Sequence, residues 1–129
     1  MKRLMLFLFV AYSTLIFAQN NIDREYELDG VIISALTIEC MGNEFLTFEI
    51  VNTNPYAVSV TWREEISING KKIGEGDDFL KSFFVEANAT LVGDCTFKES
   101  SYIEKRLNRG GYLRNLTSFD LNSINVNKK

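Results

Sequence analysis

The chain has 129 residues, of which 46% are hydrophobic and 24% charged, and its formal net charge is −3. This length suits a single domain, and the acidic balance disfavours binding to nucleic acid or anionic membranes, which both require a positive field. With no histidine and only two cysteines, the chain cannot form histidine-dependent catalytic groups, histidine-containing zinc sites or four-cysteine metal sites. No cofactor is expected.

The first segment is typical of a secretory signal peptide. It begins with a short basic stretch, residues 1–3, which contains Lys2 and Arg3. Residues 4–17 are mainly apolar, and a plausible cleavage point follows Ala18. The apolar run is shorter than the roughly 20 residues that span a bilayer; an uncleaved anchor is the alternative. We predict that residues 1–18 are removed on export to the periplasm or the medium, which leaves no membrane span. Removal takes two of the 14 basic residues and none of the 17 acidic ones, so the net charge falls from −3 to −5.

Residues 19–27 are polar and are interpreted as a lead-in to a domain over residues 28–127. The first predicted strand, residues 31–41, is rich in β-branched side chains. Leu36, Ile38 and Cys40 share one parity within it, which predicts that Cys40 points inward.

The clearest alternation of apolar and polar residues runs from Tyr56 to Ile68, with Trp62 on the apolar parity. Such a period of two predicts a strand with one buried face. The preceding segment around Phe48 alternates in the same way, and the turn-forming residues 52–55 separate the two. We therefore predict that these strands are antiparallel neighbours.

An Asn69-Gly70 pair follows, which is a strong signal for a two-residue hairpin. It predicts that Ile68 lies opposite Lys71 and Ile66 opposite Ile73. Further strands are expected over residues 79–85, covered on both sides, and over residues 91–97, 102–107 and 119–126, the last with a bulge near residues 122–123.

These elements predict an all-β domain of seven or eight short strands, arranged as one antiparallel β-sandwich; a small closed barrel is the rival architecture. An exported chain meets an oxidising compartment, so Cys40 and Cys95 are expected to form one structural disulfide. Closing a loop of about 55 residues would stabilise the fold by roughly 4 kcal/mol.

The runs FEIVNTNPYAVSVTWREEISINGKKI and VEANATLVGDC resemble segments of small exported immunoglobulin-like domains of Gram-negative bacteria. The resemblance covers about residues 44–97 and is architectural. It implies an immunoglobulin-like sandwich without an assigned activity. Trp62 follows Cys40 by more residues than in an immunoglobulin core, so the immunoglobulin topology itself is not implied.

Two acidic features are candidate sites. Glu64 occupies the apolar parity of its strand, where a buried carboxylate could act as a general acid; we expect instead that the strand leaves the core or that a bulge turns Glu64 outward. The cluster Glu75, Asp77 and Asp78 could hold Ca²⁺ through oxygen ligands, although a solvated acidic turn is the favoured interpretation.

One basic patch is a candidate ligand-binding loop. It comprises Lys105, Arg106, Arg109, Tyr112 and Arg114, and it could bind an anionic group such as a sugar acid or phosphate. A solvated charged loop is the alternative.

The leading functional hypothesis is an exported, non-catalytic binding or structural module of the cell envelope or medium, with a protein or glycan partner. The alternatives are a small carboxylate-dependent hydrolase or Ca²⁺-dependent binder and an exported inhibitor or immunity-type protein.

Overall fold

The computed structural model describes residues 24–73, 79–98 and 102–129. Within these ranges the chain forms β-strands and no α-helix, so no described helix could cross a membrane. The strands are β1 (Glu25–Leu28), β2 (Val31–Cys40), β3 (Asn43–Asn52), β4 (Val58–Ile68), β5 (Lys71–Ile73), β6 (Leu80–Val85), β7 (Thr90–Val92), β8 (Ile103–Glu104), β9 (Arg106–Arg109) and β10 (Tyr112–Lys128).

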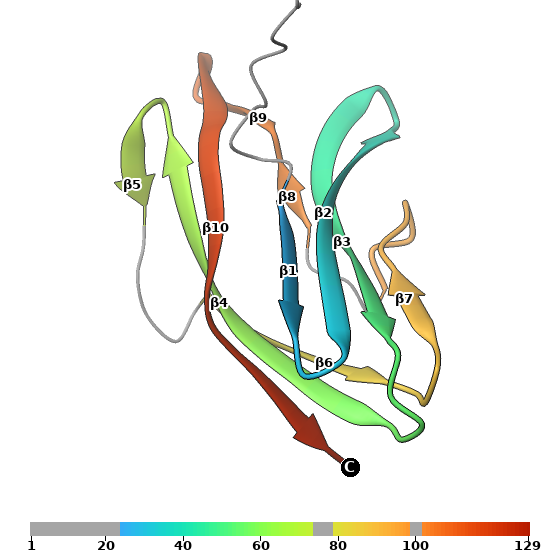
Figure 1. The fold of residues 1–129 in the computed structure, drawn as a ribbon. Coiled ribbons are helices and arrows are strands. Elements are labelled where there is room, and N and C mark those ends of the chain that lie inside the picture. The colour runs from blue at the N-terminus through green and yellow to red at the C-terminus, as the bar shows by residue number, and fades with distance from the viewer. Residues whose placement is uncertain (1–23, 74–78, 99–101) are drawn as a thin grey trace, which may run out of the picture.

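Two antiparallel sheets pack against each other (Figure 1). Sheet A has the order β1-β2-β3-β7, with β8 also paired to β3. Sheet B has the order β5-β4-β10-β9, with β6 also paired to β4. The predicted all-β sandwich is therefore confirmed.

The core between the sheets is aromatic at its centre. Phe48 of sheet A contacts Trp62 and Phe119 of sheet B, with ring centroids 5.1 and 5.4 Å apart. Burial of each such side chain contributes about 1.5–3 kcal/mol. The apolar parity of β4 faces this core as predicted, since Val58, Val60 and Trp62 are all fully buried.

The predicted pairing of β3 with β4 is wrong. β3 pairs with β2, β7 and β8 in sheet A, whereas β4 pairs with β5, β6 and β10 in sheet B. Residues 53–57 thus carry the chain across the sandwich, and the two strands face each other through their apolar side chains. The turn itself was correctly located, but turn chemistry does not specify which sheet the next strand joins.

The disulfide Cys40–Cys95 is confirmed, with the two Cα atoms 5.6 Å apart. The expected parity of β2 is wrong, because the residues that face the core are Val31, Ile33 and Ala35. Cys40 is buried on the opposite face of sheet A. On the same face, Phe45 packs against Phe97 and Tyr102, with centroids 5.0 and 5.9 Å away. The disulfide therefore lies at the margin of a small outer cluster, outside the main core.

Several predicted strands differ in extent. β6 is exposed on one side, at Leu80 and Phe84, so the expectation of cover on both sides is wrong. The strand predicted over residues 91–97 is only Thr90–Val92, and Cys95 lies in the turn beyond it. Residues 102–107 form parts of two strands, β8 and β9, which belong to different sheets. β1 begins at Glu25, inside the segment interpreted as a lead-in.

The local turn predictions hold. Asn69 and Gly70 have φ values of 50° and 77°, as a type I′ turn requires, and Ile66 pairs with Ile73 and Ile68 with Lys71. The register of β10 against β4 shifts between residues 122 and 125, where Ser123 has a φ of 52°. A β-bulge therefore lies where the parity of apolar residues changes.

At one end of the sandwich, the side chain of Asn52 forms hydrogen bonds both to the segment that follows β3 and to the end of β6. Its Nδ2 donates to the carbonyl oxygens of Tyr56 and Glu86 at 2.9 and 3.0 Å, and more weakly to that of Val85 at 3.4 Å. Its Oδ1 accepts from the backbone and side-chain nitrogens of Asn54, both at 3.0 Å. Asn52 is 1% exposed, so these bonds are made away from water and are correspondingly costly to lose.

Candidate ligand-binding groove

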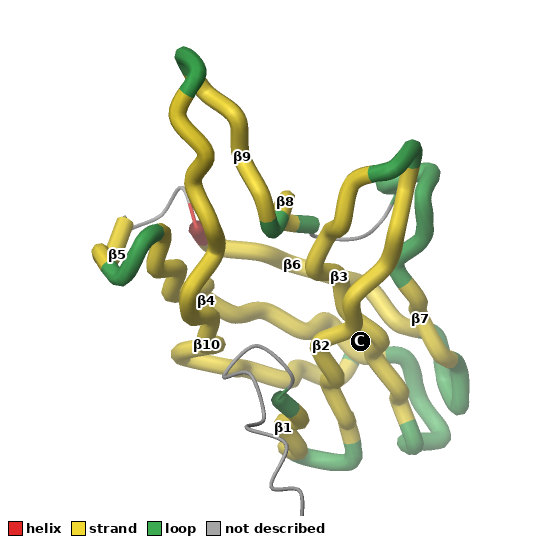
Figure 2. The backbone as a smooth tube through the Cα atoms, turned by 90° about the horizontal axis from the view of Figure 1, so that it is seen from above, coloured by secondary structure: helices red, strands yellow, loops and turns green. Residues whose placement is uncertain are grey.

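The β2–β3 and β9–β10 hairpins project from the same end of the molecule (Figure 2). Residues at the bases of these segments line a groove of about 640 Å³. Its volume is in the range of small-molecule sites. The lining residues are Gly42, Asn43, Glu44, Lys105, Arg106, Asn115, Leu116 and Thr117. Most of these are polar, so the groove is suited to a hydrogen-bonding ligand.

Lys105 lies at the point where the chain passes from sheet A to sheet B. Its backbone N–H donates to the Glu44 carbonyl in β3, and its carbonyl accepts from the Leu116 N–H in β10, both at 2.9 Å. The next residue, Arg106, pairs with Asn115 in β10. The backbone that carries the two cations is therefore held by hydrogen bonds to both sheets.

The β10 wall of the groove is braced by the Asn69-Gly70 turn. Asn69 Oδ1 accepts from the Asn115 N–H at 2.9 Å. Thr117 Oγ1 donates to the Ser67 carbonyl at 3.1 Å and accepts from the Gly70 N–H at 2.9 Å. These bonds fix the position of the wall before any ligand arrives, which lowers the entropic cost of binding.

The basic patch predicted from the sequence is divided. Lys105 and Arg106 line the groove, but Tyr112 and Arg114 lie beyond it on the β9–β10 hairpin, where Arg114 pairs with Leu107. Paired residues share a face and alternate with their neighbours along the strands, so Arg114 and Tyr112 lie on the face opposite Arg106. The segment predicted as a loop is this hairpin, and Arg109 is the residue paired with Tyr112.

The hairpin ends in Gly110 and Gly111, whose φ values are 62° and 79°. Two successive positive φ values form a tight type I′ turn. Tyr112 is 77% exposed and Leu113 is 55% exposed. The tip therefore presents an aromatic and an aliphatic side chain to solvent on a short two-stranded ribbon.

The structure bears differently on the two acidic candidate sites. Glu75, Asp77 and Asp78 lie outside the described residues, and within the described ranges no group of three His, Cys, Asp or Glu residues is placed to hold a metal ion. Glu64 is only 3% exposed, so the expectation that it turns outward is wrong. Its Oε1 lies 3.5 Å from Nε1 of Trp62, which donates to it.

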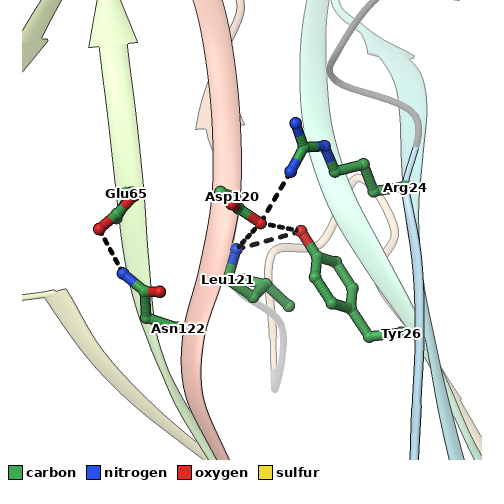
Figure 3. Close-up of polar contacts among 6 residues, drawn as sticks. All are labelled: Arg24, Tyr26, Glu65, Asp120, Leu121 and Asn122. Carbon is green, nitrogen blue, oxygen red and sulfur yellow. Dashed lines mark hydrogen bonds and ion pairs between the residues drawn. The ribbon is translucent and has the colours of Figure 1, made fainter.

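A polar cluster that sequence reasoning missed connects the two sheets (Figure 3). Tyr26 of β1 donates through its hydroxyl to Asp120 Oδ1 in β10 at 2.6 Å and accepts from the Leu121 N–H at 3.1 Å. Arg24 Nη1 lies 3.0 Å from the same carboxylate oxygen. Glu65 accepts from Asn122 and from Lys72 nearby on sheet B. The cluster lies beside the free edge of β10.

The ionisation of this cluster reflects its contacts. Burial alone would raise the pKa of Asp120, but the Tyr26 hydroxyl, the Leu121 amide and the Arg24 guanidinium together hold that pKa below its ordinary value. Burial raises the pKa of Tyr26, and the hydrogen bond to Asp120 raises it further. The cluster is thus arranged for an ionised Asp120 and a neutral Tyr26.

We predict that Asp120→Asn reduces the loss of stability in acid. Because the pKa of Asp120 is lower in the folded chain, its contribution is present above the ordinary value of about 3.9 and is lost as the pH falls through the folded-state value. The group is partly exposed, so the difference should stay below about 1 kcal/mol. Urea unfolding of both proteins between about pH 6 and pH 2 measures it; parallel pH profiles would contradict the assignment.

Arg24 and Tyr26 are close in sequence, but Asp120 lies 94 residues after Tyr26. Only the alternation of Glu25–Leu28 could have identified β1, and no local pattern pairs Tyr26 with Asp120. Comparisons with known proteins found no matching protein-family model, no matching curated protein and no matching solved structure.

Proposed function

We propose that the chain is an exported, non-catalytic β-sandwich, of the immunoglobulin-like kind that its sequence resembles, which binds an acidic glycan in the groove at Lys105 and Arg106. The observation that carries the proposal is the strand crossing at Lys105, which places two adjacent cations on a backbone fixed to both sheets. Export is supported by the predicted signal peptide and by the disulfide, a bond that persists in oxidising compartments.

The chemistry of the groove favours binding over hydrolysis. Glu44 is the one carboxylate among the described lining residues, whereas glycoside hydrolysis generally requires a pair of carboxyl groups on either side of the scissile bond. Asn43 and Asn115 supply amide groups that match sugar hydroxyls. Glu64 is enclosed in the core, where a substrate could reach it only if the sheets separated.

A direct test compares acidic and neutral oligosaccharides as ligands of the purified protein. We expect uronate-containing oligosaccharides to bind and neutral ones of equal length not to bind. Arg106→Gln should weaken binding about tenfold or more, as for the loss of a charged hydrogen bond. Isothermal titration calorimetry measures both effects.

Lys98→Gln is the matched control, since it also removes one exposed cation but lies outside the groove. It should leave the affinity unchanged. Equal binding of neutral and acidic sugars, or equal losses for the two variants, would contradict the proposed site.

A second candidate function, as an exported inhibitor or immunity-type protein, is favoured by the hairpin tip. Exposed tyrosine and arginine residues are common hot spots of protein interfaces, and Tyr112 and Arg114 lie together on one face of the hairpin. Capture of one specific protein from envelope extracts that is lost with Tyr112→Ala but retained with Arg106→Gln would favour this function over glycan binding.

A further inference from the structure

The free edge of β6 is the surface with the strongest capacity for strand pairing. β6 pairs with β4 along one side, and no other described strand pairs with it. Its six residues run from Leu80 to Val85 without a register shift. Backbone N–H and C=O groups on an unpaired strand edge form a template for another strand.

The other edges carry features that oppose such pairing. β1 has exposed Glu25 and Glu27 and is four residues long. β10 has two register shifts along the part that pairs with β4, and the Leu121 N–H on its free side is already donated to Tyr26. β5 and β7 have three residues each. β6 is longer than β1, β5 and β7 and has no register shift, and its one charged residue, Lys81, lies on the inner parity, paired with Trp62.

The side chains of β6 are also apolar where they meet solvent. Leu80 is 49% exposed and Phe84 is 55% exposed, and both lie on the outer face of sheet B with Ser82 between them. The inner parity is occupied by Phe83, stacked on Trp62 at 4.8 Å, and by the buried Val85. Among the described elements, none packs over this outer face closely enough to bury Leu80 or Phe84.

From this edge we propose that the protein forms a symmetric dimer in which β6 of one copy pairs antiparallel with β6 of a second copy. A two-fold axis perpendicular to the sheet through Ser82 keeps both outer faces on the same side. It places Leu80 of one copy opposite Phe84 of the other, and the reverse, so two apolar cross-strand pairs form. Lys81 then faces Phe83 of the other copy, so no like charges meet.

The sequence of β6 favours a second copy of the chain as the partner that pairs with this edge. The strand is complementary to itself, because its outer face reads apolar, polar, apolar about Ser82 and is unchanged by the two-fold rotation. Two-fold contacts are the commonest closed assemblies of identical chains. The pairing joins sheet B of the two copies into one continuous sheet and leaves the groove at Lys105 and Arg106 outside the contact.

Sedimentation velocity of the purified protein tests the dimer. We expect a mass twice that of the processed chain over part of the range from about 1 µM to about 1 mM, where small interfaces dissociate. Phe84→Lys should raise the dissociation constant about 100-fold, because the substitution occurs twice in each dimer. Leu113→Lys is the control, with an equally exposed side chain on the β9–β10 hairpin, and should leave the dimer intact.

A second experiment tests the proposed pairing register between the two copies of β6. Leu80→Glu combined with Phe84→Lys places opposite charges at both cross-strand pairs, so the double variant should recover dimerisation relative to either single variant. Ser82→Cys should be cross-linked between copies by a short thiol reagent, whereas Leu113→Cys should not. A monomer throughout the concentration range, or a dimer unaffected by Phe84→Lys, overturns the proposal; capture of a different protein's strand by a monomeric chain also overturns it.

Discussion

Replacing Asn52 by aspartate is expected to lower the free energy of unfolding by about 3 kcal/mol at neutral pH, as loss of two or more buried hydrogen bonds would. Aspartate has the same shape and keeps the acceptor that binds Asn54. It replaces the Nδ2 donor by an oxygen that faces the carbonyl oxygens of Tyr56 and Glu86. An ionised carboxylate has no proton to donate there, so attraction becomes repulsion.

The pH dependence separates this mechanism from a general packing defect. A protonated aspartate can donate one hydrogen bond, so Asn52→Asp should recover part of its lost stability below about pH 4, whereas Asn52→Leu should not. Urea unfolding of the three proteins at both pH values provides the measurement. Asn127→Asp is the control, because Asn127 is exposed near the end of β10. A loss no larger than that of the control would show that the Asn52 contacts are not structural.

The strands could be predicted from the sequence wherever one face of a strand is buried. The alternation in β4 correctly identified its core residues, including the position of Glu64, because side-chain parity is a local property of an extended chain. The expectation that the cost of burying a carboxylate would turn Glu64 outward is wrong. The five other positions of this parity in β4 are buried, and Glu64 is buried with them.

Sheet membership could not be predicted in the same way. The turn after Asn52 is compatible both with a return into sheet A and with a crossing to sheet B, and the structure shows the crossing. β6 illustrates a second limit: the run LKSFFV is apolar on both parities, and periodicity alone does not distinguish a strand covered on both sides from an exposed edge.

The candidate site was only partly predictable for a related reason. Nearness in sequence suggested one patch from Lys105 to Arg114, but a hairpin alternates its side chains between two faces. The structure therefore places Arg106 in the groove and Arg114 on the opposite side. The other wall of the groove, at Asn43 and Glu44, is distant in sequence from Lys105, and no local pattern joins the two.

Removal of the disulfide is the other change with a large expected effect. Cys40→Ala combined with Cys95→Ala should lower the free energy of unfolding by about 4 kcal/mol, which is the entropy of closing a loop of this length in the unfolded chain. The loop has a sequence separation of 55 and contains β3 to β7. The bridge therefore links the end of β2 in sheet A to the turn after β7. The chain reaches that turn only after it has formed β4, β5 and β6 of sheet B.

The position of the bridge makes its mechanism testable. Cys40 and Cys95 lie beside the outer cluster of Phe45, Phe97 and Tyr102 rather than in the main core, so their loss should not disturb Trp62. If the bridge acts on the unfolded chain, the double variant should fold more slowly with little change in its unfolding rate. Stopped-flow Trp62 fluorescence in urea measures both rates.

Phe97→Ala separates the bridge from the cluster that it adjoins. This variant removes the ring 5.0 Å from Phe45 but keeps the covalent link, so it should cost less than the double cysteine variant and should act mainly on the unfolding rate. A reducing agent should reproduce the cysteine effect in the wild-type protein and leave the double variant unchanged. If Phe97→Ala and the double variant lose equal stability through the same rate, the bridge stabilises the outer cluster of the folded protein instead, and the loop-entropy explanation is wrong.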